Sequence, residues 1–99
     1  DVRVLPNPHW RADLRPFTGR DDAIIDFLQQ HQASHDMLED IHHFVKRWLP
    51  AFADSDRSYV TVAMGGTGGR HRSVFITEQL AKRLRDEGTT LQVRHRELD

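Results

Sequence analysis

Apolar residues recur every three or four positions between Ile24 and Leu49, which is the pattern of amphipathic helices packed on a core. An aspartate at position 21 or 22 can cap the first helical turn, and Ser34 can cap a second helix. Pro50 marks an end or a kink. The pattern therefore predicts two helices, or one long bent helix, in this stretch.

A further helix is predicted over residues 73–87, with Gly88 in the position that commonly ends a helix. Three shorter apolar runs, residues 1–5, 59–64 and 90–96, have the composition of strands. The order strand, helices, strand, helix, strand predicts an α/β fold. We expect a small parallel sheet with right-handed crossovers and helices packed on it.

A glycine-rich loop at residues 65–72 joins the second predicted strand to the last helix, and a turn at residues 54–56 precedes that strand. Glycines let backbone N–H groups approach an anion closely, and a helix N-terminus offers further free N–H groups. Thr67 and Ser73 can donate hydroxyl hydrogen bonds, and Arg72 can bind two phosphate oxygens. The pattern predicts a phosphate site at the carboxyl edge of the sheet, with a plain glycine turn as the alternative. The loop lacks the Gly-Lys-Ser/Thr ending of a nucleotide P-loop.

Composition supports a single small domain. The chain has 99 residues, 37% of them hydrophobic and 29% charged, with a formal net charge of −1. It contains no cysteine and no apolar run approaching the length of a membrane span, so we expect a cytoplasmic protein and no membrane contact. Because the chain begins with Asp1 in a strand-like run, we expect it to be part of a longer protein.

Several short motifs are distributed over the whole chain: Asp1-Val2-Arg3, Leu5-Pro6-Asn7-Pro8-His9-Trp10, Leu14-Arg15-Pro16, Thr18-Gly19, Arg57-Ser58-Tyr59, Gly65 with Thr67-Gly68-Gly69, His71-Arg72-Ser73-Val74 and Arg94-His95-Arg96. In this combination the chain resembles the C-terminal domain of the RapZ (YvcJ) family of bacterial RNase adaptors. The family has two domains, and the resemblance implies that residues 1–99 are one of them. The other, a Walker-type nucleotide-binding domain, is not in this chain.

The resemblance also implies function. Enteric members of the family sense glucosamine-6-phosphate, bind a small regulatory RNA and present it to RNase E. No catalytic residue, metal site or cofactor is implied for this domain, and self-association of the longer protein is left open. Two departures from the family are Gly66, where a cysteine is usual, and the absence of a basic tail after Asp99. The implied phosphosugar pocket comprises His9, Thr67, Gly68, Gly69 and Arg72, with His71 and Ser73 nearby.

Basic residues near the loop and on the last helix form a candidate RNA-backbone footprint. Such a footprint binds through phosphates and depends on salt concentration. A solvated helix face is the common alternative. The candidate residues are Arg70, Lys82, Arg83, Arg85, Arg94 and Arg96.

The remaining histidines and tryptophans favour structural roles. His31 and His35 have a spacing found in metal sites but no evident third ligand, so we expect surface histidines. His95 alternates with apolar residues and is predicted to be buried and hydrogen-bonded. Trp48 is predicted to lie in the core, and Trp10 to pack its own loop, with ligand contact as the alternative.

Three functions are therefore compared. The first is a regulatory binding module with a phosphosugar pocket and RNA or RNase partners. The second is a phosphoester-processing enzyme, which would need a nucleophile or metal that the sequence does not supply. The third is an assembly domain in which the loop has only a structural role.

Overall fold

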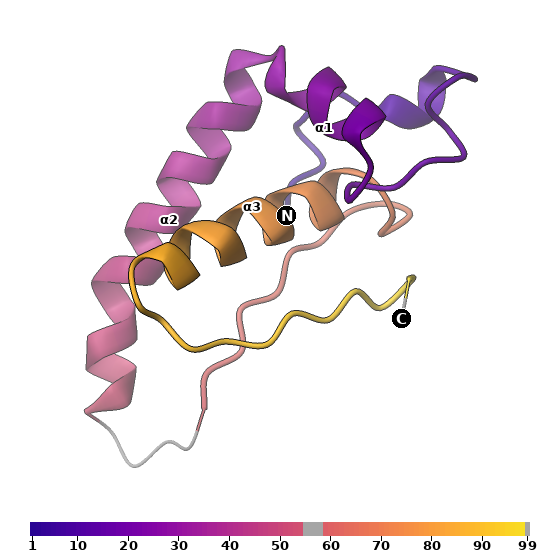
Figure 1. Cartoon of the computed structure of the whole chain (residues 1–99). Helices are drawn as coiled ribbons and strands as arrows, with labels where there is room; N and C mark the ends of the chain where they lie inside the picture. Colours follow the sequence, from indigo (N-terminus) through magenta and orange to yellow (C-terminus); the bar gives the residue numbers. More distant parts are fainter. Residues whose placement is uncertain (55–58, 99) are drawn as a thin grey trace.

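Three helices and one short 3-10 turn make up the regular secondary structure that the computed structural model shows in residues 1–54 and 59–98. The expected turn at residues 54–56 and the Arg57-Ser58 motif fall largely on residues 55–58, outside the described part. None of the described helices is long and apolar enough to cross a membrane. The elements are η1 (Pro8–Trp10), α1 (Asp22–Gln29), α2 (Gln32–Ala53) and α3 (Arg72–Asp86), shown in Figure 1.

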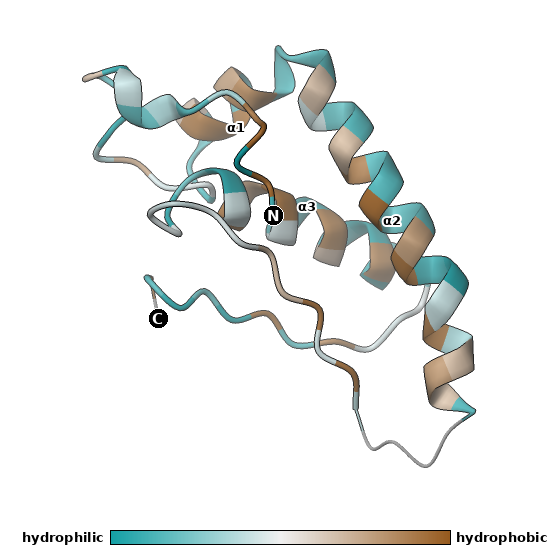
Figure 2. Cartoon of the chain, turned by 180° about the vertical axis from the view of Figure 1, so that it is seen from behind, coloured by the Kyte–Doolittle hydropathy of each residue, from teal (hydrophilic) through white to brown (hydrophobic). Residues whose placement is uncertain are grey.

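The hydrophobic core lies where the three helices meet, and the first residues of the chain close it. α3 contributes more buried residues than α1 or α2, because all of its first five residues and its later apolar positions are covered. Figure 2 shows these apolar faces turned toward one another. The core residues are Val2, Leu5, Leu14, Ile24, Leu28, Leu38, Val45, Phe75, Ile76, Leu80 and Leu84.

The predicted α/β fold is wrong, because no strand and no sheet is formed within residues 1–54 and 59–98. Within the described residues, no backbone hydrogen bond joins residues 1–5 to residues 59–64, and the nearest one runs from Val2 N to the O of Gly65, just after the second predicted strand, at 2.8 Å. A single bond is not a ladder, which needs regularly repeated pairing between neighbouring strands.

The physical reason is that an apolar run shows which residues can be buried, but not whether another strand lies beside them. Val2 and Leu5 are buried against helices. In the second predicted strand, Tyr59 is 82% exposed and Val62 is 46% exposed, so this run is not covered on both faces. The architecture is consequently helical, with irregular segments packed around α3.

The helix predictions are largely confirmed. Two separate helices occupy the first amphipathic stretch, although α2 begins before Ser34, which is buried inside the helix and is not its cap. Gly88 ends α3 as predicted, with a φ of +93°. Gly88 N donates to Arg85 O and Thr89 N donates to Leu84 O, each at 2.9 Å, which is the Schellman pattern.

The prediction for Trp48 is wrong, because its side chain is 44% exposed. α2 has 22 residues and α3 has 15, and Figure 1 shows the last turns of α2 extending past α3. The apolar stripe of α2 therefore continues beyond the partner that covers its first half. The guanidinium of Arg47 lies 5.1 Å from the Trp48 ring centroid.

Candidate phosphate-binding site

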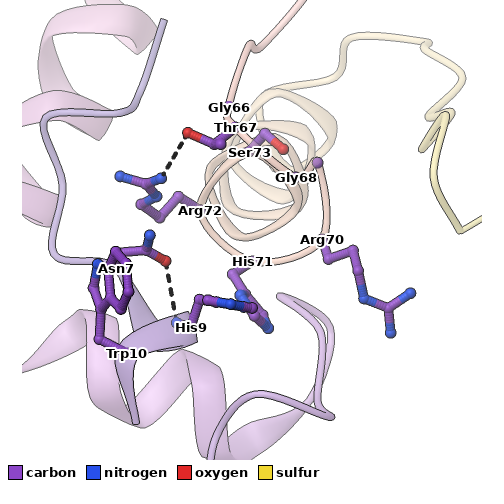
Figure 3. Close-up of a pocket in the computed structure, with 11 residues that line it drawn as sticks. Asn7, His9, Trp10, Gly66, Thr67, Gly68, Arg70, His71, Arg72 and Ser73 are labelled. Atoms are coloured by element: carbon purple, nitrogen blue, oxygen red, sulfur yellow. Dashed lines mark hydrogen bonds between the residues drawn. The ribbon is translucent and has the colours of Figure 1, made fainter.

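Arg72, the first residue of α3, holds the glycine-rich loop and the start of the chain together. Its side chain is buried, with 8% exposed, and Nη1 donates to Arg3 O at 2.7 Å and to Leu5 O at 3.1 Å. Nη2 donates to Thr67 Oγ1 at 3.4 Å, as Figure 3 shows. Burial lowers the pKa of the Arg72 guanidinium below the ordinary arginine value, and the charge of Arg3 adds to this effect.

The hydrogen bonds of the Arg72 guanidinium do not use all of its donors. A guanidinium has five N–H donors and stays charged in proteins. Three hydrogen bonds are made to atoms of the described chain. Two N–H groups are left over in this part of the structure, enough for one charge-assisted pair with an oxyanion.

The short helix η1 places His9 and Trp10 opposite the loop. Pro8 is fully buried and fixes the turn, while the two following side chains are exposed. Asn7 Oδ1 accepts a hydrogen bond from His9 N at 3.1 Å, and Arg15 Nε donates to His9 O at 2.9 Å. These bonds hold the turn from both sides. The prediction that Trp10 packs its own loop is wrong, since the indole is 79% exposed.

Gly19 brings the segment after η1 against the start of α3. Its backbone N donates to Arg70 O at 2.8 Å. A Cβ at this position would lie 2.3 Å from Phe75 N and 2.4 Å from His71 O, so only glycine allows this approach. The close contact and the hydrogen bond hold Gly19 against the residues at the start of α3.

His71 is a buried hydrogen-bond donor beside the pocket. Its Nε2 lies 3.3 Å from Arg15 O, and because a carbonyl oxygen only accepts, Nε2 carries the proton. Burial lowers the pKa of His71, and the nearby charges of Arg70 and His9 lower it further, against the opposing effect of backbone hydrogen bonds. The surroundings of His71 therefore disfavour its charged form.

These segments enclose a pocket of about 270 Å³. All seven residues of the predicted phosphosugar site line it, so the structure brings the whole predicted set together. Figure 3 shows His9 and His71 pointing toward each other, and Arg70 pointing away from the other side chains. The lining residues are Asn7, His9, Trp10, Gly66, Thr67, Gly68, Gly69, Arg70, His71, Arg72 and Ser73.

Asn7 and Trp10 also line the pocket, although Asn7 was not predicted there and Trp10 was expected only as an alternative ligand contact. An Asn-Pro pair after an apolar run is a common start of a turn, and it is the one signal that this segment bends back. The backbone at Gly66 needs no positive φ. A Cβ there would make ordinary contacts with Ser73 at 3.5–3.6 Å.

The pocket lining is rich in hydrogen-bond donors, and Glu97 lies just outside the lining, against Gly69. None of its eleven lining residues is acidic. Within the described residues, the backbone N–H groups of positions 67–70 donate to no other backbone atom. The N-terminus of α3 has neither a side-chain cap nor an acidic residue in its first turn. A bound oxyanion can satisfy these donors and the helix dipole at once.

The candidate RNA residues are spread more widely. Arg83 Nη1 forms an ion pair with Glu39 Oε1 of α2, which reduces its value as a phosphate contact. The other five are exposed: Arg70 at the pocket, Lys82 and Arg85 on α3, and Arg94 and Arg96 in the last segment. The structure thus places them on three different segments and does not join them in a single cluster with the pocket.

Among the other candidates, the prediction for His95 is confirmed. It is buried, and its Nε2 lies 2.6 Å from Glu78 Oε1 of α3. His31 stacks edge-on with Phe27 before α2, and His35 Nε2 lies 2.8 Å from Gln29 O. Within the described residues, no group of three or more His, Cys, Asp or Glu side chains could hold a metal ion.

Comparison with known proteins agrees with the motifs. Residues 1–99 match the family described as RapZ C-terminal domain. The chain is 84% identical over 98 residues to a nucleotide-binding protein of Alcanivorax borkumensis, covering 99% of this chain and 35% of the relative. It is 50% identical over 99 residues to the RNase adapter protein RapZ of Hamiltonella defensa, covering 100% of this chain and 35% of the relative. The chain thus spans about a third of these relatives and belongs to the RapZ C-terminal domain family.

Proposed function

We propose that this domain is a regulatory binding module that takes a phosphorylated amino sugar of the glucosamine-6-phosphate class in the Gly66–Ser73 pocket. The observation that carries the proposal is the absence of acidic side chains from a pocket whose wall combines loop amides, an uncapped helix start and Arg72. The phosphate would meet the amides and the remaining Arg72 donors. Thr67 and Ser73 would supply hydroxyl groups beside it, and His9 would contact the sugar.

The partners follow from the family. One relative is named an RNase adapter protein, and its matching third is similar to this chain over its full length. We propose that the domain contributes to binding an RNase and a small regulatory RNA, with pocket occupancy as the input. Lys82 and Arg85 on α3, with Arg70, Arg94 and Arg96, would contact RNA phosphates. Binding that depends on them should weaken steeply with salt.

Gly68 offers a sharp test of the pocket. No atom lies within 4 Å of a Cβ built at this position, and its φ is not positive, so a side chain fits without strain. Gly68→Asp adds a negative charge to the pocket wall, and Gly68→Asn adds nearly the same shape without the charge. Like charges brought together at a binding surface cost several kcal/mol.

Calorimetric titration with glucosamine-6-phosphate compares the two variants with the unaltered chain, using glucosamine and inorganic phosphate as controls. We expect saturable binding to the unaltered chain and to Gly68→Asn, stronger for the phosphosugar than for either control. Gly68→Asp should bind at least tenfold more weakly, which corresponds to about 1.4 kcal/mol. Equal affinities of the two variants, or no binding to the unaltered chain at millimolar ligand, would overturn the proposal.

A further inference from the structure

Trp10 presents the largest exposed aromatic surface of the pocket. The indole is 79% exposed and lines the same pocket as the glycine-rich loop. In Figure 3 it stands beside Asn7, across the pocket from Thr67 and Ser73. Its ring plane is inclined by 77° to that of His9, with centroids 5.9 Å apart, so the two rings form adjoining walls. A tryptophan face left in water gains free energy when an apolar surface covers it.

The backbone that carries Trp10 is held by hydrogen bonds of the η1 turn. Trp10 N donates to Asn7 O at 3.3 Å, and the buried Pro8 anchors the turn from below. Arg11 N donates to Pro8 O at 3.0 Å, which closes the turn on the far side of Trp10. The backbone at Trp10 therefore needs little further ordering on binding, while the exposed indole can turn its face to a ligand.

The size of the pocket points to a ligand larger than a phosphate ion. Its volume of about 270 Å³ corresponds to about nine water molecules at ~30 Å³ each. A phosphate has five heavy atoms and would leave much of this space to solvent. The anion-binding groups lie on the loop and α3, whereas Trp10 lies on η1, so a molecule filling the pocket has an anionic end and an end against the indole.

We infer that Trp10 packs against the ring of the bound phosphorylated sugar and makes the site prefer ringed phosphates over acyclic ones. This inference rests on the proposed function. The apolar C–H face of a pyranose matches the flat indole, and aromatic walls with a few fixed polar groups are usual in small-molecule sites. Glycerol 3-phosphate carries the same phosphate ester but has no ring to cover Trp10. Inorganic phosphate has neither a carbon skeleton nor a ring.

The test follows Trp10 directly in the 99-residue chain. Trp48→Phe leaves Trp10 as the sole tryptophan, because the chain has two, and Trp48 lies on α2 outside the pocket. Affinities for glucosamine-6-phosphate, glycerol 3-phosphate and inorganic phosphate are measured by calorimetry. Trp10 fluorescence is recorded in the same titrations. Trp10→Ala and Trp10→Phe are compared with this background, after circular dichroism has shown that both retain its helix content.

We expect glucosamine-6-phosphate to shift the emission wavelength of Trp10 and to change its intensity. Trp10→Ala should weaken the binding of glucosamine-6-phosphate at least fivefold. Trp10→Phe should lose less affinity for the phosphosugar than Trp10→Ala does. The affinity for inorganic phosphate should be the same in the background chain and in both Trp10 variants. If the phosphosugar binds the Trp10→Ala chain as tightly as the background, the inference is wrong and the proposed function stands. If none of the chains binds it, both are wrong.

Discussion

Gly19 gives the most direct test of how the pocket is held in shape. In a Gly19→Ala variant the new methyl group would lie 2.3 Å from Phe75 N, 2.4 Å from His71 O and 2.8 Å from Val74 Cβ. Two of these three contacts are with backbone atoms at the start of α3, which cannot rotate away. The segment around Gly19 must therefore move off the helix, and its hydrogen bond to Arg70 O is lost or lengthened.

The expected loss of stability follows from the steric clash and from the loss of this hydrogen bond. Overpacking a filled site costs about 1–3 kcal/mol, and a lost backbone hydrogen bond costs about 1 kcal/mol. Gly19→Ala should then lower the free energy of unfolding by about 2–4 kcal/mol. For a domain of this size the thermal midpoint should fall by roughly 10–25 °C.

Gly68→Ala is the matched control, because it makes the same chemical change in the same chain. No atom lies within 4 Å of its Cβ, and its φ is not positive. Both substitutions reduce the freedom of the unfolded chain, by an amount that stabilises a protein by about 0.4–1 kcal/mol. The difference between the two variants therefore isolates the clash. Urea unfolding followed by circular dichroism measures it, and equal midpoints for the two variants would refute the packing described for Gly19.

Two further predictions concern residues of the pocket wall. Arg72→Ala removes charge-assisted hydrogen bonds to Arg3 O and Leu5 O, each worth about 1.5–3 kcal/mol. Urea unfolding should therefore show that the free energy of unfolding falls by about 3 kcal/mol or more. Arg85→Ala, on the exposed face of α3, should change it little. The lowered pKa of His71 means that the unfolded chain binds its proton first, so stability from this group is complete above about pH 6.5 and declines as the pH falls below that value. His71→Gln should remove this part of the decline, and parallel curves of stability against pH for the two chains would count against it.

The helices were predictable because their signals are local. The spacing from Ile24 onward, and a glycine at position 88 just after a helical stretch, depend on neighbours within a few residues along the chain. Burial of His95 followed from its alternation with apolar residues, although its partner Glu78 on α3 was not evident. The grouping of the seven predicted pocket residues was also anticipated, by the glycine loop and by the family resemblance.

The prediction of a parallel sheet was wrong, and the reason lies in residues 1–5 and 59–64. Their apolar residues satisfy a strand pattern, but strand pairing is a relation between distant segments that a single sequence does not record. The roles of Gly19 and Arg72 depend on similar long-range relations. Gly19 contacts a helix more than fifty residues later, and Arg72 binds carbonyl groups near the beginning of the chain.

An amide NMR titration of the chain with glucosamine-6-phosphate tests the central claim most directly, because it reports where the ligand binds. Glucosamine and inorganic phosphate serve as controls at fixed salt concentration. The proposed site predicts saturable shifts concentrated in residues 65–73 and at His9, stronger for the phosphosugar than for either control. Unchanged spectra at millimolar ligand, or shifts confined to residues outside the pocket, would contradict it.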